Sequence, residues 1–400
     1  MNMEHRYLYI ETFGCQMNVH DSEQMTILLN DIGYQQTNDS AKADLILINT
    51  CSIREKAEQK AFSELGRLMK LKEKNPDLIV GFAGCLAQHL GRKVYSRVKG
   101  VDLVFGTHNI HRLPEMIRAV QKDRKKITQI GFSSKIHSLG VFAPPPQGSV
   151  SSFVSIMQGC DNYCAYCVVP YLRGPEMSRT PEDIITENIE RIRFTTSHPK
   201  DLSEELIDCF ARVSKLCEHI HLPVQSGSSR ILKLMNRGYS ASEYFQKIDR
   251  LRKACPKISI TSDIIVGFPG ETQKDYQETI DMMEKIRFDS VFSFKYSERK
   301  GTAAGELPGR VPEVEKTQRL KELQALQDRH TQEKNTALEG SIQEVLVEGL
   351  SRNSEQDLMG RARSWRIVNF KGDAGLIGRK VPVEISRGYL HSLRGKMIKN

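Results

Sequence analysis

Short apolar runs alternate with longer helical stretches through the first third of the chain. The apolar runs are rich in β-forming residues and lie at Tyr7–Ile10, Leu45–Ile48 and Leu78–Phe82. The stretches after them have helical composition and length and lie near Ser22–Asn30, Arg54–Lys72 and Leu86–Val98. Alternation of this kind predicts an α/β domain in which helices cover a parallel sheet.

A second alternating series begins at Ser151, after the proline run of Ala143–Gly148. Three consecutive prolines disfavour both helix and inner strand, so this run predicts a linker. The expected strands of the second series are Phe153–Met157, Ile192–Thr196, His219–Leu222, Ile258–Val266 and Val291–Tyr296. Helical stretches fall between them, which predicts a parallel barrel or partial barrel.

The pattern changes again after a charged helical segment at Val314–Asn335. Gln343–Glu348, Trp365–Phe370 and Val381–Ser386 resemble strands separated by glycine-rich turns, which predicts a small β-barrel. We therefore expect an N-terminal domain at 1–142, a linker at 143–150, a barrel domain at 151–336 and a β-domain at 337–400.

One junction in the second series lacks a turn. Pro181–Asn188 reads as a helix that Thr180 caps and that has proline at its first position. It runs into the strand Ile192–Thr196 without a glycine, asparagine or other stop signal between them. A barrel built of strand–helix repeats normally has a turn at such a point.

Composition and charge narrow the class of protein. The formal net charge of the 400 residues is +9, and residues 338–400 contain 11 Lys and Arg against 7 Asp and Glu. This basic excess favours a polyanionic partner such as nucleic acid. No apolar run has the length of a membrane span, and Met1–Ile10 does not resemble a signal peptide. We therefore expect a cytoplasmic protein without a membrane partner, whose nine cysteines are not disulfide-bonded.

The strongest chemical motif is Cys160, Cys164 and Cys167, a CxxxCxxC loop just after the expected strand Phe153–Met157. Three thiolates on one loop hold three irons of a four-iron cluster and leave the fourth iron open to a small ligand. The alternative is a structural zinc site, which needs a fourth protein ligand at compatible spacing. The next cysteine, Cys209, lies some forty residues further along the chain.

A second group consists of Cys15, Cys51 and Cys85, each of which directly follows an expected strand. Loops after the carboxyl ends of parallel strands converge in one crevice, so these cysteines are candidates for a second cluster. The alternative is three buried cysteines in turns. We interpret the other three, Cys209, Cys217 and Cys255, as ordinary core or surface thiols.

Two glycine- and proline-rich loops at one face of the expected barrel are candidates for a cofactor pocket. Small residues at the end of a strand allow a ligand to approach the backbone closely. The candidate cofactor-binding residues are Pro223, Gln225, Ser226, Gly267, Pro269, Gly270 and Glu271.

With these motifs, the chain resembles the radical-SAM methylthiotransferases over nearly its whole length. Thr12–Asn18 and Asn49–Ala57 are similar to the signatures of the branch that acts on isopentenylated adenosine in tRNA. The branches that act on a ribosomal protein or on threonylcarbamoyladenosine differ around these cysteines. The C-terminal domain resembles the RNA-binding TRAM module.

The resemblance implies methylthiolation of carbon 2 of N6-(dimethylallyl)adenosine at position 37 of tRNA by a radical S-adenosylmethionine mechanism. It implies two [4Fe-4S] clusters, one on Cys160, Cys164 and Cys167 and a sulfur-carrying one on Cys15, Cys51 and Cys85. S-adenosyl-L-methionine, an electron donor such as flavodoxin or ferredoxin, and a monomeric chain are further expectations. An unactivated aromatic C–H offers no acid and no leaving group, so the chemistry needs a cofactor-derived radical.

The chain departs from the family pattern at Asn188–Ile189. The family has another strand and helix here, with a Leu-Leu-Gly-Gln-Asn-like turn where the methionine amino group of the cofactor is expected to be recognised. The loss is on the order of 30 to 50 residues, about one strand–helix repeat. We therefore expect an incomplete barrel and impaired turnover, and the alternative function is a tRNA-binding cluster protein without methylthiotransferase turnover.

Overall fold

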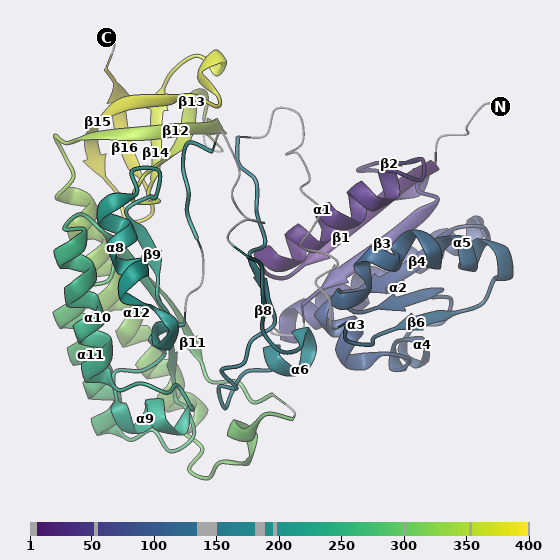
Figure 1. The fold of residues 1–400 in the computed structure, drawn as a ribbon, viewed down its shortest axis with the longest axis horizontal. Helices are drawn as coiled ribbons and strands as arrows, with labels where there is room; N and C mark the ends of the chain where they lie inside the picture. Colours follow the sequence, from purple (N-terminus) through teal and green to yellow (C-terminus); the bar gives the residue numbers. More distant parts are fainter. Residues whose placement is uncertain are drawn as a thin grey trace. The chain divides into compact units, whose positions relative to one another are not determined.

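The computed structural model describes residues 6–51, 55–133, 150–180, 189–194, 198–299, 301–351 and 354–398. The chain forms two compact units (Figure 1). The first comprises Met1–Gln147, Ser151–Tyr163 and Val168–Ile185, and the second comprises Gly148–Val150, Cys164–Cys167 and Thr186–Asn400. No helix in these described ranges is both long enough and apolar enough to cross a membrane.

The first unit contains a six-stranded parallel sheet in the order β2-β1-β3-β4-β5-β6. Its strands are β1 (Arg6–Phe13), β2 (Tyr34–Gln36), β3 (Leu45–Thr50), β4 (Ile79–Ala83), β5 (Leu103–Phe105) and β6 (Ile127–Gln129). Its helices are α1 (Gln16–Asn30), α2 (Glu55–Lys74), α3 (Cys85–Leu90), α4 (Lys93–Arg97) and α5 (Leu113–Asp123). The predicted parallel α/β domain is confirmed.

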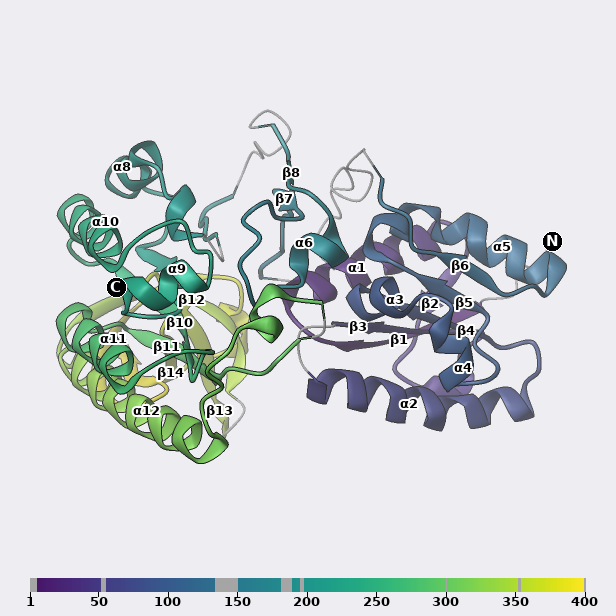
Figure 2. The same cartoon turned by 90° about the horizontal axis from the view of Figure 1, so that it is seen from below.

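Helices cover both faces of this sheet (Figure 2). On one face, Met25 of α1 and Ile117 of α5 pack against Leu47 of β3. On the other face, Leu65 of α2 packs against Ile48 of the same strand. Every residue of β3 is buried, which explains why the strand is a continuous apolar run and does not alternate.

The second unit contains a three-stranded parallel sheet in the order β11-β10-β9. The strands are β9 (His219–His221), β10 (Ser259–Val266) and β11 (Ser290–Lys295). The helices are α8 (Glu204–Arg212), α9 (Ser229–Leu234), α10 (Ala241–Ala254), α11 (Gln273–Ile286) and α12 (Glu313–Thr336). The expected partial barrel is therefore present, with three strands in its sheet.

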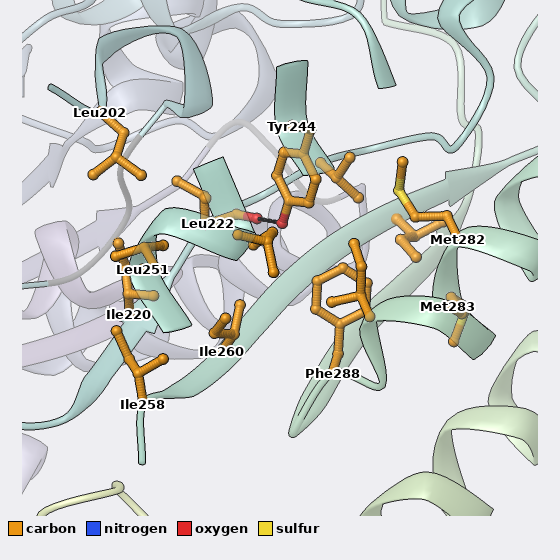
Figure 3. Packing of buried hydrophobic residues seen from close by; sticks show 14 of the residues in the cluster. Leu202, Ile220, Leu222, Tyr244, Leu251, Ile258, Ile260, Met282, Met283 and Phe288 are labelled. Atoms are coloured by element: carbon orange, nitrogen blue, oxygen red, sulfur yellow. Dashed lines mark hydrogen bonds between the residues drawn. The ribbon is translucent and has the colours of Figure 1, made fainter. Parts of the chain in front are cut away.

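One cluster of buried apolar residues in this unit lies between the sheet and its helices (Figure 3). Ile220 of β9, Ile260 of β10 and Met283 of α11 are fully buried in it. Tyr244 of α10 is buried as well, and its hydroxyl donates a hydrogen bond of 2.7 Å to the Leu222 carbonyl. The aromatic ring therefore contributes apolar area without leaving a buried hydroxyl unpaired.

Two of the expected barrel strands are corrected by the structure. Only the end of Phe153–Met157 is extended, as β7 (Met157–Gln158), which pairs antiparallel with β8 (Met177–Ser178) in a separate two-stranded sheet. In Ile192–Thr196, Ile192 makes one isolated parallel bridge to Leu216, and residues 195–197 lie outside the described ranges. Short apolar runs do not reveal which strand they pair with, so composition alone overestimated their pairing.

The junction without a turn, between Pro181–Asn188 and Ile192–Thr196, lies partly outside the described residues. The predicted helix Pro181–Asn188 and the proline linker up to residue 149 cannot be compared with the structure for this reason. On the far side of the junction, the Arg191 guanidinium donates to the Arg361 carbonyl at 2.9 Å and to the Glu344 carboxylate at 2.8 Å. Arg193 stacks on Trp365, 3.5 Å from the ring centroid. This segment is thus held in part by contacts with the C-terminal domain.

The C-terminal domain is a closed five-stranded barrel in the order β12-β13-β14-β16-β15, as predicted. Its strands are β12 (Ile342–Ser351), β13 (Ser354–Ala362), β14 (Ile367–Lys371), β15 (Lys380–Gly388) and β16 (Leu393–Met397). Val345, Val368 and Phe370 are fully buried in its core. Arg363 joins the barrel to the second unit's sheet because its guanidinium pairs with Glu218, just before β9, at 2.7 Å.

We expect the second unit to lose stability in mild acid through His219. This side chain is buried, and Arg193 donates to its Nδ1 at 3.1 Å, so the ring is held neutral. Burial lowers the pKa of His219 to about 3, whereas the unfolded chain takes up a proton near pH 6.5. Unfolding therefore becomes easier as pH falls through that window. Between pH 7 and pH 5 the loss should be about 2 kcal/mol.

Urea unfolding at pH 7 and pH 5 measures this effect. His219→Gln keeps a side-chain amide beside Arg193 but removes the titrating ring. The variant should show a smaller difference between the two pH values than the natural chain. An equal difference in both proteins would assign the acid sensitivity to other groups.

Candidate functional site

Cys15, Cys51 and Cys85 follow directly on three neighbouring strands of the first unit's sheet, β1, β3 and β4. In the order β2-β1-β3-β4-β5, the chain reverses direction across the sheet between β1 and β3. In open parallel sheets, ligands bind beyond the carboxyl ends of the strands at such a point. The three cysteines therefore lie at the edge where this fold places its binding sites.

Two glycines allow the cysteine-bearing turns to approach one another. A Cβ on Gly14 would lie 2.7 Å from the Cβ of Cys51, which is closer than atoms pack. Gly84 has φ of 91°, and a Cβ there would lie 2.6 Å from the Thr50 carbonyl oxygen. Any larger residue at either position would separate the turns.

A buried amide network fixes the same turns. Asn49 donates from Nδ2 to the Asn18 carbonyl at 2.7 Å and to the Ser22 hydroxyl at 2.9 Å. Asn18 donates from its own Nδ2 to Asn49 Oδ1 at 3.2 Å, and its Oδ1 accepts from the Cys15 backbone N–H at 3.4 Å. Both asparagines are fully buried. The network therefore ties the end of β3 to the start of α1 beside the cysteines.

The electrostatics of the three thiols differ. A hydrogen bond with Cys51 lowers the pKa of Cys15 to about 5, against the opposing effect of burial and with help from the backbone near Asn18 and from Arg173. Burial raises the pKa of Cys85, which the positive charge of Arg173 opposes. Cys15 is thus readily deprotonated to the thiolate, which is the form that binds metal. Deprotonation of Cys85 depends on the nearby cation, Arg173.

The CxxxCxxC loop crosses from one compact unit to the other. Cys160 lies in the first unit and Cys164 and Cys167 lie in the second. The Cys160 backbone N–H donates to the Gly174 carbonyl at 3.2 Å, and Asn162 Nδ2 donates to Cys160 Sγ at 3.7 Å. The Cys167 N–H donates to the Cys164 carbonyl at 2.9 Å, which forms a turn between the last two cysteines.

Cys164 is the buried member of this motif and has two nitrogen neighbours. Arg237 Nη1 donates to its sulfur at 3.3 Å, and the His198 ring nitrogen Nε2 lies 3.8 Å from the same atom. Burial lowers the pKa of His198 to about 3, so the ring is neutral. The cation that faces this sulfur is therefore Arg237.

The first candidate cofactor loop, with Pro223, Gln225 and Ser226, continues β9 at its carboxyl end. Gln225 pairs with Ile264 of β10 in an isolated bridge and has φ of 74°, so the chain turns there away from the sheet. The Pro223 carbonyl accepts from Arg237 Nη2 at 2.6 Å. Ser226 is fully buried, and its hydroxyl lies 3.4 Å from the Thr279 hydroxyl.

The second candidate loop, with Gly267, Pro269, Gly270 and Glu271, follows β10. The Glu271 carboxylate accepts from the Gly267 N–H at 2.7 Å and pairs with Arg319 of α12 at 2.5 Å. Both charged side chains are almost fully buried. Glu271 therefore closes the turn at the end of β10, and a cofactor would meet the backbone of this loop.

Sequence reasoning missed the two buried arginines, Arg173 and Arg237. Each lies in a short apolar or mixed stretch and directly precedes a glycine, Gly174 or Gly238. The sequence did contain one signal for these arginines. Each is a charged residue in such a stretch and lies a few residues from a cysteine motif or a glycine-rich loop. The sequence did not show which sulfur either guanidinium contacts.

The candidate ligands form two sets of three cysteines. Among the described residues, no three His, Cys, Asp or Glu side chains are spaced as ligands of one metal ion. An iron–sulfur cluster takes each cysteine on a separate iron. Two sets of three cysteines, each with a buried guanidinium at one sulfur, are suited to two clusters that each have one iron without a protein ligand.

Three family profiles match successive parts of the chain. The Uncharacterized protein family UPF0004 matches residues 7–106, the Radical SAM superfamily matches residues 185–283, and the TRAM domain matches residues 336–398. The Radical SAM match begins close to the turnless junction and does not reach back to the CxxxCxxC loop.

Full-length relatives are similar to the whole chain. A tRNA-2-methylthio-N(6)-dimethylallyladenosine synthase of Syntrophus aciditrophicus (strain SB) is 53% identical over 441 positions, covering 100% of this chain and 96% of that protein. The synthase of Geobacter sulfurreducens (strain ATCC 51573 / DSM 12127 / PCA) is 45% identical over 439 positions, covering 99% and 98%. Among solved structures, the cobalamin-dependent S-adenosylmethionine radical enzyme OxsB is a distant match, with a TM-score of 0.49, 12% identity, and coverage of 81% of this chain and 56% of that chain.

Proposed function

The chain belongs to the family of tRNA-2-methylthio-N(6)-dimethylallyladenosine synthases, and we propose that it methylthiolates carbon 2 of N6-(dimethylallyl)adenosine at position 37 of tRNA. The observation that carries this proposal is similarity along the entire chain to synthases of that name, at 53% and 45% identity. The chain is accordingly a radical-SAM enzyme that transfers sulfur and methyl groups.

Six cysteines are the proposed ligands of two [4Fe-4S] clusters. Cys160, Cys164 and Cys167 would hold the cluster that binds S-adenosylmethionine, and Cys15, Cys51 and Cys85 would hold the sulfur-carrying cluster. When bound, the first cluster supplies the electron that cleaves S-adenosylmethionine to methionine and a 5′-deoxyadenosyl radical. This assignment is supported by the position of the second set at the switch point of the sheet.

The backbone of two loops would bind the cofactor at the carboxyl ends of β9 and β10. Pro223, Gln225 and Ser226 form one side of this proposed site. Gly267, Pro269 and Gly270 form the other, with the Glu271 carboxylate keeping their turn closed through the Gly267 N–H. Glycine at 267 and 270 leaves the backbone accessible to a ligand.

The C-terminal barrel is the proposed contact for tRNA. It matches the TRAM domain, and residues 338–400 have an excess of Lys and Arg. Basic side chains bind the phosphate backbone of nucleic acids. We further propose that the chain acts as a monomer in the cytoplasm, with flavodoxin or ferredoxin as electron donor.

We infer that the barrel beside the loop of Cys160, Cys164 and Cys167 is shorter than that of the relatives. The alignment with the Syntrophus protein spans 441 positions against the 400 residues of this chain, so about 41 positions of the alignment have no residue of this chain. We place this loss at Asn188–Ile189, because the segment after it makes one isolated bridge instead of a strand. We expect the shortened barrel to slow turnover without removing the cluster ligands.

The test is an anoxic reconstitution of the full chain with iron and sulfide, followed by incubation with S-adenosylmethionine, a reductant and isopentenylated tRNA. We expect release of 5′-deoxyadenosine and mass-spectrometric detection of the methylthio group on adenosine 37, both more slowly than with the Syntrophus relative. Equal rates would refute the impairment. Binding of tRNA with two clusters but without either product would instead establish the alternative, a tRNA-binding cluster protein.

A further inference from the structure

Arg173 is a buried cation at the sulfur of Cys85. It ends α6 (Val169–Arg173), which packs on α3, the helix that begins with Cys85. Its Nε donates to Cys85 Sγ at 3.2 Å, and its Nη2 pairs with the buried Asp21 carboxylate at 2.7 Å. The side chains of Arg173 and Asp21 are 8% and 9% exposed. The guanidinium is therefore held in one orientation between α1 and a thiol.

Arg237 has the same relation to the sulfur of Cys164. It is 4% exposed, and its Nη1 donates to Cys164 Sγ at 3.3 Å. Its Nη2 donates to the Pro223 carbonyl at 2.6 Å, and its Nε donates to the Tyr239 hydroxyl at 3.0 Å. Arg237 thus joins a cysteine of the CxxxCxxC loop to the loop that continues β9.

Burying these cations has a cost that structural packing alone does not explain. A buried charge is costly unless a partner of opposite charge compensates for it. Arg173 has one carboxylate partner, Asp21, while Arg237 is hydrogen-bonded to a carbonyl, a hydroxyl and a sulfur. In the part of the chain that the structure describes, both guanidinium-to-sulfur hydrogen bonds end on candidate cluster ligands. A negatively charged cluster would supply the missing compensation at Arg237 and would add to that of Asp21 at Arg173.

We propose that Arg173 and Arg237 are positioning residues, one for each cluster, that fix a ligand sulfur and place a positive charge beside it. This proposal rests on the proposed function, because it requires both clusters. Hydrogen bonds to the sulfurs and the local charge are among the factors that set the reduction potential of a cluster. A cation favours the more negative, reduced state. Arg173 therefore raises the potential of the cluster at Cys15, Cys51 and Cys85, and Arg237 raises that of the other.

Arg237 has a second consequence for its site. Its fork geometry spans the cysteine sulfur and the Pro223 carbonyl at once, which a lysine cannot reproduce. We therefore expect the position of Cys164 to be coupled to the loop after β9. The second partner of Arg173, Asp21, belongs to α1.

The test measures the potential of each cluster separately, in the full-length chain reconstituted under anoxic conditions. Cys160→Ala isolates the cluster at Cys15, Cys51 and Cys85, and Cys15→Ala isolates the other. In each background, Arg173→Gln and Arg237→Gln are compared by redox titration monitored with electron paramagnetic resonance. Each substitution should lower the potential of its own cluster and leave that of the other unchanged.

Controls separate this role from a general loss of folding. Asp21→Asn with Arg173→Gln removes the carboxylate that would be left unpaired, and it should still lower the potential of the cluster at Cys15, Cys51 and Cys85. Arg237→Lys keeps the positive charge, so its cluster should have a potential close to that of the natural chain. It loses the second contact, to the Pro223 carbonyl, so the width of its resonance lines should be restored less fully. Arg212→Gln, on an exposed arginine, should change neither cluster.

Each outcome supports or overturns the proposal. Unchanged potentials in arginine variants that hold their full iron, while the natural chain shows two clusters, would overturn the role of the arginines and leave the proposed function intact. A natural chain that forms fewer than two clusters would overturn both. Crossed effects, in which Arg173→Gln shifts only the cluster of Cys160, Cys164 and Cys167, would also overturn the assignment.

Discussion

Replacing Cys160 with alanine is expected to abolish 5′-deoxyadenosine release and to reduce the chain from two clusters to one. After the substitution, only two cysteines remain on the loop, so a second iron has no protein ligand. The protein retains such a cluster through its thiolate ligands. Cys15, Cys51 and Cys85 lie on separate strand ends and form their own hydrogen-bonded site, so their cluster should remain.

Iron and sulfide analysis with electron paramagnetic resonance, together with chromatography of the released nucleoside, measures this result. Cys209→Ala is the matched control, since Cys209 of α8 is a partly buried thiol that packs against the core and is not a candidate ligand. It should keep both clusters and its full cleavage rate. Cleavage by Cys160→Ala at the natural rate would show that the CxxxCxxC loop does not bind the reactive cluster.

The largest effect on stability is expected from breaking the ion pair of Glu271 and Arg319. Their side chains are 1% and 3% exposed, and Arg319 also pairs with Glu315 on its own helix. Arg319→Met leaves the buried Glu271 carboxylate without its cation, which should cost about 3–5 kcal/mol. The second unit would then unfold at a lower concentration of urea, as measured by circular dichroism.

Two variants complete the comparison. Arg319→Met with Glu271→Gln removes both charges and should recover much of the loss, because the cost comes from the unpaired carboxylate. Arg212→Gln breaks a pair with Asp208 in which both side chains are mostly exposed, and it should change stability by about 1 kcal/mol or less. A loss for Arg319→Met as small as that of Arg212→Gln would mean that water reaches Glu271.

The strands that sequence patterns predicted most closely are longer runs with many β-branched residues. β3 is a continuous, fully buried run, and β10 is a longer strand that mixes β-branched and polar residues, and both were expected close to their observed bounds. β2, β5 and β6 are three residues long, and runs of that length leave no periodicity to detect. In the C-terminal barrel, β13 was missed because Ser354–Ala362 is mostly polar and small.

The part of the candidate site that lies at the ends of strands could be predicted from the sequence. Cys15, Cys51 and Cys85 each follow a strand, and the parallel topology alone brings such positions to one edge. Arg173 and Arg237 were not predictable in the same way. Their contacts join residues that lie 88 and 73 positions apart in the chain, and no spacing rule relates them. The ion pair of the Glu271 carboxylate with Arg319 of α12 was likewise not predicted from the sequence.

The stacking of Arg193 and Arg361 on Trp365 has a practical consequence. Trp365 is the chain's one tryptophan, and it lies where the β-barrel meets the segment that contains Arg193. The emission of this indole therefore reports on a single contact without any added label. Because that contact includes Arg193, a change in fluorescence that precedes the loss of helical circular dichroism would reveal release of the barrel before the rest of the second unit unfolds. The chain thus contains its own optical reporter at the contact between the β-barrel and the segment that contains Arg193.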